Sequence, residues 1–183
     1  MKWPVLTCVL ACTQFPASGL TAPPSPYIGQ EARDIKSLSP EEIDAYVAGK
    51  GMGLAKAAEL NGYPGPSHVL ELASQLRLTP EQKSATDALF AAMQKEASEL
   101  GRSLVEGERR LDQLFAGRSV DEASLARALE EIGTTQARIR GAHLKAHLAQ
   151  ARILTPEQTS HYAELRGYDT SDVPRDHSLH HAQ

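Results

Sequence analysis

Leu78-Thr79-Pro80-Glu81-Gln82 opens the central stretch of this chain, and Leu154-Thr155-Pro156-Glu157-Gln158 closes it. The two pentapeptides are identical, and a divergent copy precedes them as Leu38-Ser39-Pro40-Glu41-Glu42. An internal repeat can change the interpretation of a whole fold. Here the repeat divides the chain into segments and indicates where several of them begin.

Each copy of the pentapeptide has the pattern of a helix start. A Thr or Ser accepts hydrogen bonds from backbone N–H groups that the first helical turn leaves unpaired, and Pro fits the next position. Three residues after the cap, a Gln or Glu can reach back to the cap's own N–H group and complete a capping box. The spacing therefore predicts helices that begin after Ser39, Thr79 and Thr155.

The sequence between the identical copies predicts two long helices, because apolar residues recur there every three or four positions. The first helix is expected from Pro80 to Ala116. The second is expected to start after Ser119, with Glu122 completing a capping box, and to run to about Arg152. A short turn joins them, so they should pack antiparallel. The apolar stripes comprise Leu89, Met93, Ala97, Leu100, Leu104, Leu111 and Leu114/Phe115 on the first helix and Leu125, Ala128/Leu129, Ile132, Ile139 and Ala146 on the second.

Shorter helices are expected on both sides of this hairpin. They run from Pro40 to Ala48, from Leu54 to Leu60 and from a cap at Ser67, and the last pentapeptide starts a further one. Within the first long helix, Gly101 and Gly107 are expected to permit close packing or a bend. No segment shows the two-residue alternation of a strand. We therefore predict an all-α fold, a long antiparallel helical hairpin with short flanking helices.

Residues 1–22 have the features of an export signal. Met1-Lys2 supplies a positive start, the stretch from Trp3 to Ala11 is largely apolar, and small residues follow. Both cysteines, Cys8 and Cys12, lie in this segment, so its removal would leave no thiol. One alternative is lipoprotein processing, which would leave Cys12 as a lipid-bearing first residue. Another is a start with no targeting role.

The remaining chain divides into three parts. Residues 23–38 are rich in proline and predict an extended leader, and residues 39–167 predict one all-helical domain. Residues 168–183 are polar and are expected to be disordered. The histidines of this tail, His177, His180 and His181, either bind transition metals weakly or are only solvated. After the signal, no apolar run approaches the roughly 20 residues that span a bilayer.

Composition and motifs argue against two classes of function. The formal net charge is −4, which disfavours a nucleic-acid partner attracted by net charge. The stretch Gly49-Lys50-Gly51-Met52-Gly53 lacks the spacing of a phosphate-binding loop and predicts a hinge. No G-x-S-x-G elbow or separate base indicates a nucleophilic enzyme. We expect a protein that is not an enzyme.

A pair of histidines is the candidate metal site. His143 and His147 lie one turn apart on one helix face, so their rings could share a Zn, Ni, Co or Cu ion. Leu144 follows the first histidine, so the H-E-x-x-H motif of zinc proteases is absent. A third ligand would have to come from elsewhere, such as His68, Met52 or His161. The alternative is a pair of half-buried or interface histidines.

The same helix carries a run of basic residues. Between Glu131 and Glu157 there is no acidic residue, and a surface of one sign can attract an acidic partner. Alternatively, the basic residues are balanced by acids on the neighbouring helix, Glu96, Glu99, Glu106 and Glu108. The candidate binding residues are Arg138, Arg140, Lys145 and Arg152, with Leu144 and Leu148 between them.

Two L-T-x-x-Q motifs around a long helical hairpin, behind an export signal, resemble the Spy/CpxP family of periplasmic stress proteins. The residues that carry this resemblance are Leu78, Thr79 and Gln82 with Leu154, Thr155 and Gln158. The resemblance implies a cradle-shaped antiparallel homodimer. It also implies an ATP-independent chaperone for unfolded envelope proteins, or an adaptor that inhibits an envelope-stress sensor kinase. Related members of the wider group are periplasmic heavy-metal sensors.

Two functions are therefore expected from different classes. The first is a periplasmic chaperone or adaptor that binds proteins on its basic helical surface. The second is a periplasmic heavy-metal sensor or resistance protein that binds a transition metal through histidines. The chain also departs from the family pattern, since it has an additional helical region from Ser39 to Gly62 and few aromatic residues.

Overall fold

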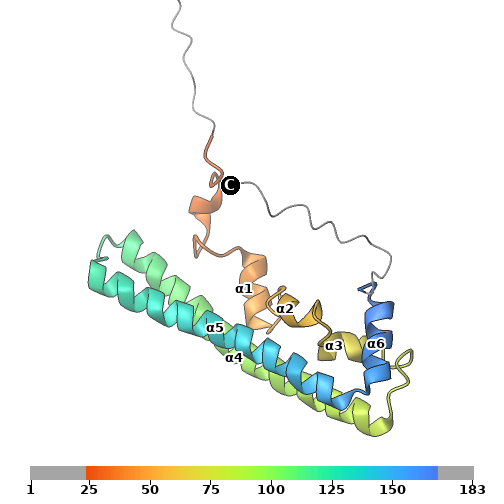
Figure 1. The fold of residues 1–183 in the computed structure, drawn as a ribbon. Coiled ribbons are helices and arrows are strands. Elements are labelled where there is room, and N and C mark those ends of the chain that lie inside the picture. Colours follow the sequence, from red (N-terminus) through yellow and green to blue (C-terminus); the bar gives the residue numbers. More distant parts are fainter. Residues whose placement is uncertain (1–23, 169–183) are drawn as a thin grey trace, which may run out of the picture.

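The computed structural model describes residues 24–168, which form a long helical hairpin with shorter helices packed along it (Figure 1). No strand occurs in this range, so the predicted all-α class and the hairpin are confirmed. The export signal, the two cysteines and the histidine tail lie outside these residues. The elements are the 3-10 helix η1 (Gln30–Ala32) and the α-helices α1 (Pro40–Val47), α2 (Lys56–Glu59), α3 (Pro66–Glu71), α4 (Pro80–Ala116), α5 (Glu122–Ile153) and α6 (Pro156–Leu165).

Helices α4 and α5 form the frame of the molecule. They run antiparallel, with α1, α2 and α3 along one side and α6 at the end opposite the α4–α5 turn (Figure 1). The predicted apolar stripes face each other in the middle of the hairpin, with Leu100 and Leu104 of α4 packed against Ile132 and Ile139 of α5. Two residues assigned to the stripes are exposed instead, Phe115 and Leu129, which lie towards the turn, where the short helices do not cover the hairpin (Figure 1). No helix in the described range is sufficiently long and apolar to cross a bilayer.

Three predicted capping boxes are present, at Ser39, Thr79 and Thr155. At Thr79, the hydroxyl oxygen accepts from the N–H of Gln82 at 3.2 Å, and the Gln82 side-chain oxygen accepts from the N–H of Thr79 at 3.1 Å. Each pentapeptide therefore starts a helix as the spacing predicts.

Two other predicted caps were wrong. Helix α5 is capped by Asp121 with Ser124, whereas the Ser119 hydroxyl bonds the Leu114 carbonyl instead. A carboxylate is a stronger acceptor for backbone N–H groups than a hydroxyl, which favours the later start. Helix α3 begins at Pro66 rather than after Ser67, because a proline suits the first helical position.

The segment before α1 is not extended, contrary to the prediction. It forms turns and the short helix η1, and Ile35 and Leu38 are buried against Val105 of α4. Burying an aliphatic side chain contributes about 1.5–3 kcal/mol, which outweighs the weak preference of this proline-rich segment for extended structure.

Close packing at Gly101 brings α1 onto the frame. A Cβ atom at this position would overlap the carbonyl oxygen of Tyr46, near the end of α1. The Ser98 hydroxyl donates to the neighbouring Val47 carbonyl at 2.5 Å. The predicted close packing at this glycine is therefore confirmed.

The two identical pentapeptides meet at one end of the hairpin. The Gln82 amide nitrogen donates to the Gln158 side-chain oxygen at 2.8 Å, and the Gln158 nitrogen donates in return to Gln82 at 3.0 Å. The same two nitrogens also donate to the carbonyls of Ile153, at 2.9 Å, and Leu76, at 3.1 Å. We call this arrangement the glutamine clasp (Gln82 and Gln158). It joins the start of α4 to the start of α6.

Candidate functional site

A pocket of about 550 Å³ lies beside the hairpin, where short segments cover α4 and α5. Its walls come from loop 49–53, α2, the start of α3, the two long helices and the chain after α6. The predicted pair His143 and His147 lies in it, and we call it the histidine pocket. Its lining includes Met52, Glu59, Gly65, Met93, His143 and His147.

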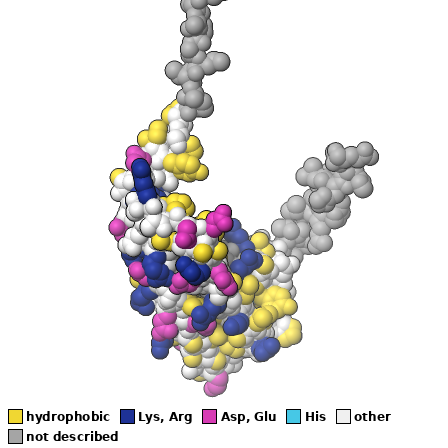
Figure 2. Space-filling view, turned by 90° about the vertical axis from the view of Figure 1, so that its left-hand side faces the viewer, with side chains coloured by type: hydrophobic (Ala, Val, Ile, Leu, Met, Phe, Trp, Pro, Cys, Tyr) yellow, Lys and Arg dark blue, Asp and Glu magenta, His cyan; other side chains and the backbone are white. Residues whose placement is uncertain are grey.

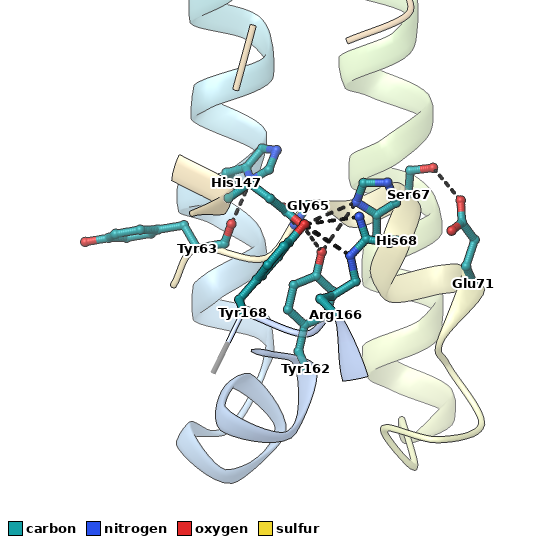
Figure 3. Close-up of polar contacts among 10 residues, drawn as sticks. Tyr63, Gly65, Ser67, His68, Glu71, His147, Tyr162, Arg166 and Tyr168 are labelled. Carbon is teal, nitrogen blue, oxygen red and sulfur yellow. Dashed lines mark hydrogen bonds and ion pairs between the residues drawn. The ribbon is translucent and has the colours of Figure 1, made fainter. Parts of the chain in front are cut away.

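His147 is held in one tautomer. Its Nδ1 atom lies 2.7 Å from the carbonyl oxygen of Tyr63 (Figure 3). Because a carbonyl only accepts hydrogen bonds, Nδ1 carries a proton, and Nε2 is the nitrogen through which the neutral ring can bind a metal ion. A backbone carbonyl commonly orients a metal-binding imidazole in this way.

Gly65 allows the loop before α3 to close on that ring. A Cβ atom at Gly65 would lie 2.9 Å from Cε1 and 3.0 Å from Nε2 of His147. These separations are shorter than a side-chain contact permits, so any other residue would displace the ring or the loop. The glycine therefore permits the close approach of this loop to the ring of His147.

His143 has a buried nitrogen without a partner. The residue is 5% exposed, and its Nε2 atom forms no hydrogen bond in the described part of the chain. Burial lowers the pKa of the ring, and the neighbouring His147 lowers it further, so the neutral form is favoured. Loop 49–53 covers this ring, since a Cβ at Gly51 would be 3.7 Å from its Nδ1 atom.

Glu59 of α2 is the centre of a polar cluster beside His147. Figure 3 shows other members of this cluster, His68, Tyr162, Arg166 and Tyr168. Its carboxylate is mostly buried and accepts hydrogen bonds from Tyr162 at 2.5 Å, Tyr168 at 3.1 Å and the Gly65 N–H at 3.2 Å. Burial and this carboxylate raise the pKa of Tyr162, so the phenol remains a donor. Three nitrogens lie slightly further from the carboxylate, on His68 at 3.5 Å, Arg166 at 3.6 Å and His147 at 3.7 Å.

The structure brings two of the three proposed additional ligands to the histidine pair. Met52 and His68 line the pocket, whereas His161 lies elsewhere, 2.9 Å from Glu164 on the surface of α6. Among residues 24–168, no three His, Cys, Asp or Glu side chains are grouped so that they could hold a metal ion.

Three pocket residues were missed in the sequence. Met93 was assigned only to the apolar stripe of α4, and Glu59 and Gly65 were assigned no role. A single carboxylate in a four-residue helix has no periodic or spacing signal. The one local signal was that Glu59 is the only acidic residue in the segment Leu54–Leu60.

The predicted protein-binding residues lie on the exposed side of α5. We call Arg138, Arg140, Leu144, Lys145, Leu148 and Arg152 the basic face. All are exposed except Leu144, which is half-buried.

The four cations of the basic face, Arg138, Arg140, Lys145 and Arg152, form no ion pair with a carboxylate of the described chain. Two of the acids proposed to balance them are engaged elsewhere. Glu106 pairs with Arg109 and Arg110, and Glu108 accepts from Ser37. At the turn end of the hairpin, by contrast, acidic and basic side chains are interspersed (Figure 2).

A comparison with known families matches residues 49–160 to the family described as heavy-metal resistance. This match spans more than half of the 183 residues. The chain belongs to the heavy-metal resistance family. It is a helical family related to Spy and CpxP, so the predicted relationship is confirmed at the level of this wider group. Comparisons with curated proteins and with solved structures found no match.

The matched residues include the whole α4–α5 hairpin, the loop 49–53 and the histidine pair. Both copies of the L-T-x-x-Q motif also lie within them. The part of the chain that carries the family relationship is therefore also the part that builds most of the histidine pocket.

Proposed function

We propose that this heavy-metal resistance family member binds a transition-metal ion in the histidine pocket and acts in the periplasm as a sensor or resistance protein. The observation that carries this proposal is the buried Nε2 atom of His143, which has no hydrogen-bond partner in the described chain. A buried polar atom of this kind requires an explanation, because leaving it unpaired is costly. A metal ion shared with His147 would satisfy it.

The residues present fit such an ion in their chemistry. Both rings have a lone pair available, and residues four apart on a helix lie on the same face. Neutral imidazoles suit Zn, Ni, Co and Cu ions. When bound, the ion would join α5 to the loops that cover it, and the surrounding residues would only position the ligands. We propose no catalytic role.

The periplasmic location rests on the export signal predicted for residues 1–22. A member of this kind would meet metal ions before they reach the cytoplasm. Mass spectrometry of the mature N-terminus would distinguish signal removal from lipid attachment at Cys12.

Titration calorimetry with Zn²⁺, Ni²⁺, Co²⁺ and Cu²⁺ tests the metal proposal. At least one ion is expected to bind with micromolar or tighter affinity, and His143→Ala and His147→Ala should each abolish binding. His161→Ala and a triple alanine variant of His177, His180 and His181 should retain it. Circular dichroism checks that each variant is folded. No binding to the wild type, or binding that survives both pocket substitutions, would contradict the proposal.

A second function is supported by the basic face. Its four cations have no acidic partners among the described residues, and Leu148 is 49% exposed between them. Such a surface suits weak binding of a partly unfolded acidic protein or of a sensor kinase, because charge steers encounter and apolar contact holds the partner. We propose that a homodimer presents this face without using ATP.

Light scattering from reduced α-lactalbumin, an acidic protein that aggregates on reduction, tests this second function. The protein should suppress scattering without ATP, and combined Arg138→Glu, Lys145→Glu and Arg152→Glu substitutions should remove the effect. Arg118→Glu, at the hairpin turn, is the control and should behave like the wild type. Unchanged scattering at a stoichiometric excess of wild-type protein would exclude chaperone activity of this kind.

A further inference from the structure

The residues that line the histidine pocket also indicate which metal ion it would bind. We infer that it selects a soft monovalent ion, cuprous copper, with the thioether sulfurs of Met52 and Met93 as ligands beside His143 and His147. This inference rests on the proposed metal-binding function and narrows it.

Both internal methionines of the chain line this one pocket. The sequence has three methionines, and the only one besides Met52 and Met93 is Met1. Met93 enters from α4 and is almost fully buried, whereas Met52 enters from loop 49–53 and remains half exposed at the pocket wall. The two methionines therefore reach the wall of the cavity that holds the histidine pair from different segments of the chain.

The backbone at Met52 is strained. Its φ angle is +44°, in the left-handed region that side-chain-bearing residues rarely adopt. Such a conformation is energetically unfavourable and tends to occur at functional sites. Glycines stand on both sides, at Gly51 and Gly53, and glycine at the central position would remove the strain. A flexible thioether side chain is present there instead, on the loop whose Gly51 lies against the ring of His143.

The charges around the pocket disfavour a divalent ion. The lining residues include three cations, Lys50, Lys56 and Arg166, and Glu59 is the only acidic residue in the described lining. The Glu59 carboxylate is already bonded to two tyrosines and lies 3.6 Å from Arg166. It is therefore not free to neutralise a metal ion.

A monovalent ion is compatible with these surroundings. The cost of removing an ion from water rises steeply with its charge, so a site made of neutral donors beside fixed positive charges favours the lower charge. Thioether sulfur is a soft ligand and selects Cu(I), whereas Zn²⁺ sites are built from Cys, His, Asp and Glu. A site with two imidazoles and two thioethers therefore favours Cu(I) over Zn²⁺.

Anaerobic titration with Cu(I) in competition with bicinchoninate measures the affinity directly, and Zn²⁺ is titrated in parallel. Cu(I) should bind at least about tenfold more tightly than Zn²⁺, a difference of about 1.4 kcal/mol. Met52→Leu and Met93→Leu should each weaken Cu(I) binding at least about tenfold while leaving Zn²⁺ binding unchanged. Leucine conserves the side-chain volume, so both variants are expected to fold. His161→Ala is the control and should bind Cu(I) like the wild type.

X-ray absorption at the copper edge provides a second readout. Cu(I) bound to the wild type should show sulfur ligands together with nitrogen ligands, and each leucine variant should show less sulfur. If Cu(I) binds through nitrogen alone and both leucine variants match the wild type, this inference is wrong and the histidine site remains. If the histidine substitutions change no metal affinity at all, the proposed function fails as well.

Discussion

Gly101 and Gly133 are two glycines of the long helices in opposite surroundings. A Cβ atom at Gly101 would overlap the Tyr46 carbonyl oxygen, whereas a Cβ at Gly133 meets nothing within 4 Å. Replacing each glycine with alanine therefore separates two effects on stability, the packing of α1 on α4 and the intrinsic helix preference of alanine.

Gly101→Ala should lower the free energy of unfolding by about 1–3 kcal/mol, the usual cost of overpacking, because α1 must move. Gly133→Ala should raise it by about 0.5–1 kcal/mol, because alanine is the better helix former. Urea denaturation followed by circular dichroism measures both. An equal gain in stability for the two variants would show that α1 does not pack at Gly101.

Gly65 has the analogous role in the histidine pocket. Gly65→Ala should displace the His147 ring and weaken metal binding by about 10–100-fold, as loss of a residue that orients a ligand typically does. Gly51→Ala is the matched control, because its Cβ would make an ordinary 3.7 Å contact with His143. Calorimetric titration compares the two. Equal affinities for the variants would mean that the loop does not hold the ring.

At the scale of elements, the glutamine clasp explains why the repeated motif ends in Gln. A glutamate could complete a capping box, but it could not also donate to the partner amide and to a backbone carbonyl. Each Gln does all three, so the two helix starts depend on each other. The third copy, at Ser39, ends in Glu42 and forms only its own capping box.

Gln82→Ala and Gln158→Ala should each lower the free energy of unfolding by about 1–3 kcal/mol, since each leaves half-buried partners unpaired. The double variant should lose clearly less than the sum, with a coupling of about 0.5–3 kcal/mol. Gln136→Ala, on the exposed side of α5, is the control and should change stability by no more than about 0.5 kcal/mol. Strictly additive losses in urea denaturation would argue against the clasp.

The cap at the start of α5 should make the stability of the fold depend on pH. Hydrogen bonds from Ser124 lower the pKa of Asp121, so this carboxylate stabilises the fold above its unfolded pKa. That contribution is lost as the pH falls through the lowered folded value. Asp121→Ala should therefore be less stable than the wild type at pH 7, and the difference should narrow at acidic pH below about 4. Ser119→Ala should change the stability little at either pH. A larger loss of stability for Ser119→Ala than for Asp121→Ala would indicate that Ser119 caps α5, as the sequence predicted.

These elements also show what the sequence could and could not predict. Capping boxes and apolar periods are local, so the bounds of α4 were predicted to the residue, those of α1 closely, and the start of α6 correctly. The cap of α5 was missed because two overlapping cap patterns, at Ser119 and Asp121, compete there. Residues 24–38 were missed because the burial of Ile35 depends on α4, which lies far away in the chain.

At the scale of the whole molecule, the histidine pocket is built by segments that are separated in sequence. The pair on α5 was recognisable from its spacing, but Glu59, Gly65 and Met93 reach the pocket only through tertiary packing. One ion bound there would connect α5 to the covering loop. The Glu59 carboxylate lies beside His147 and accepts a hydrogen bond from Tyr162 of α6, so the ion would also lie near α6. The family relationship and the unpaired His143 nitrogen thus converge on the same region.

The most direct test is nitrogen-15 NMR of the histidine rings while Ag⁺, a redox-inert surrogate for Cu⁺, or Zn²⁺ is added. The chain has seven histidines. The Nε2 signals of His143 and His147 should shift together at one equivalent of metal, while the His147 Nδ1 proton remains on the Tyr63 carbonyl. His161 should not respond. Shifts confined to His161 or to the tail histidines, with His143 and His147 unchanged, would contradict a metal site in this pocket.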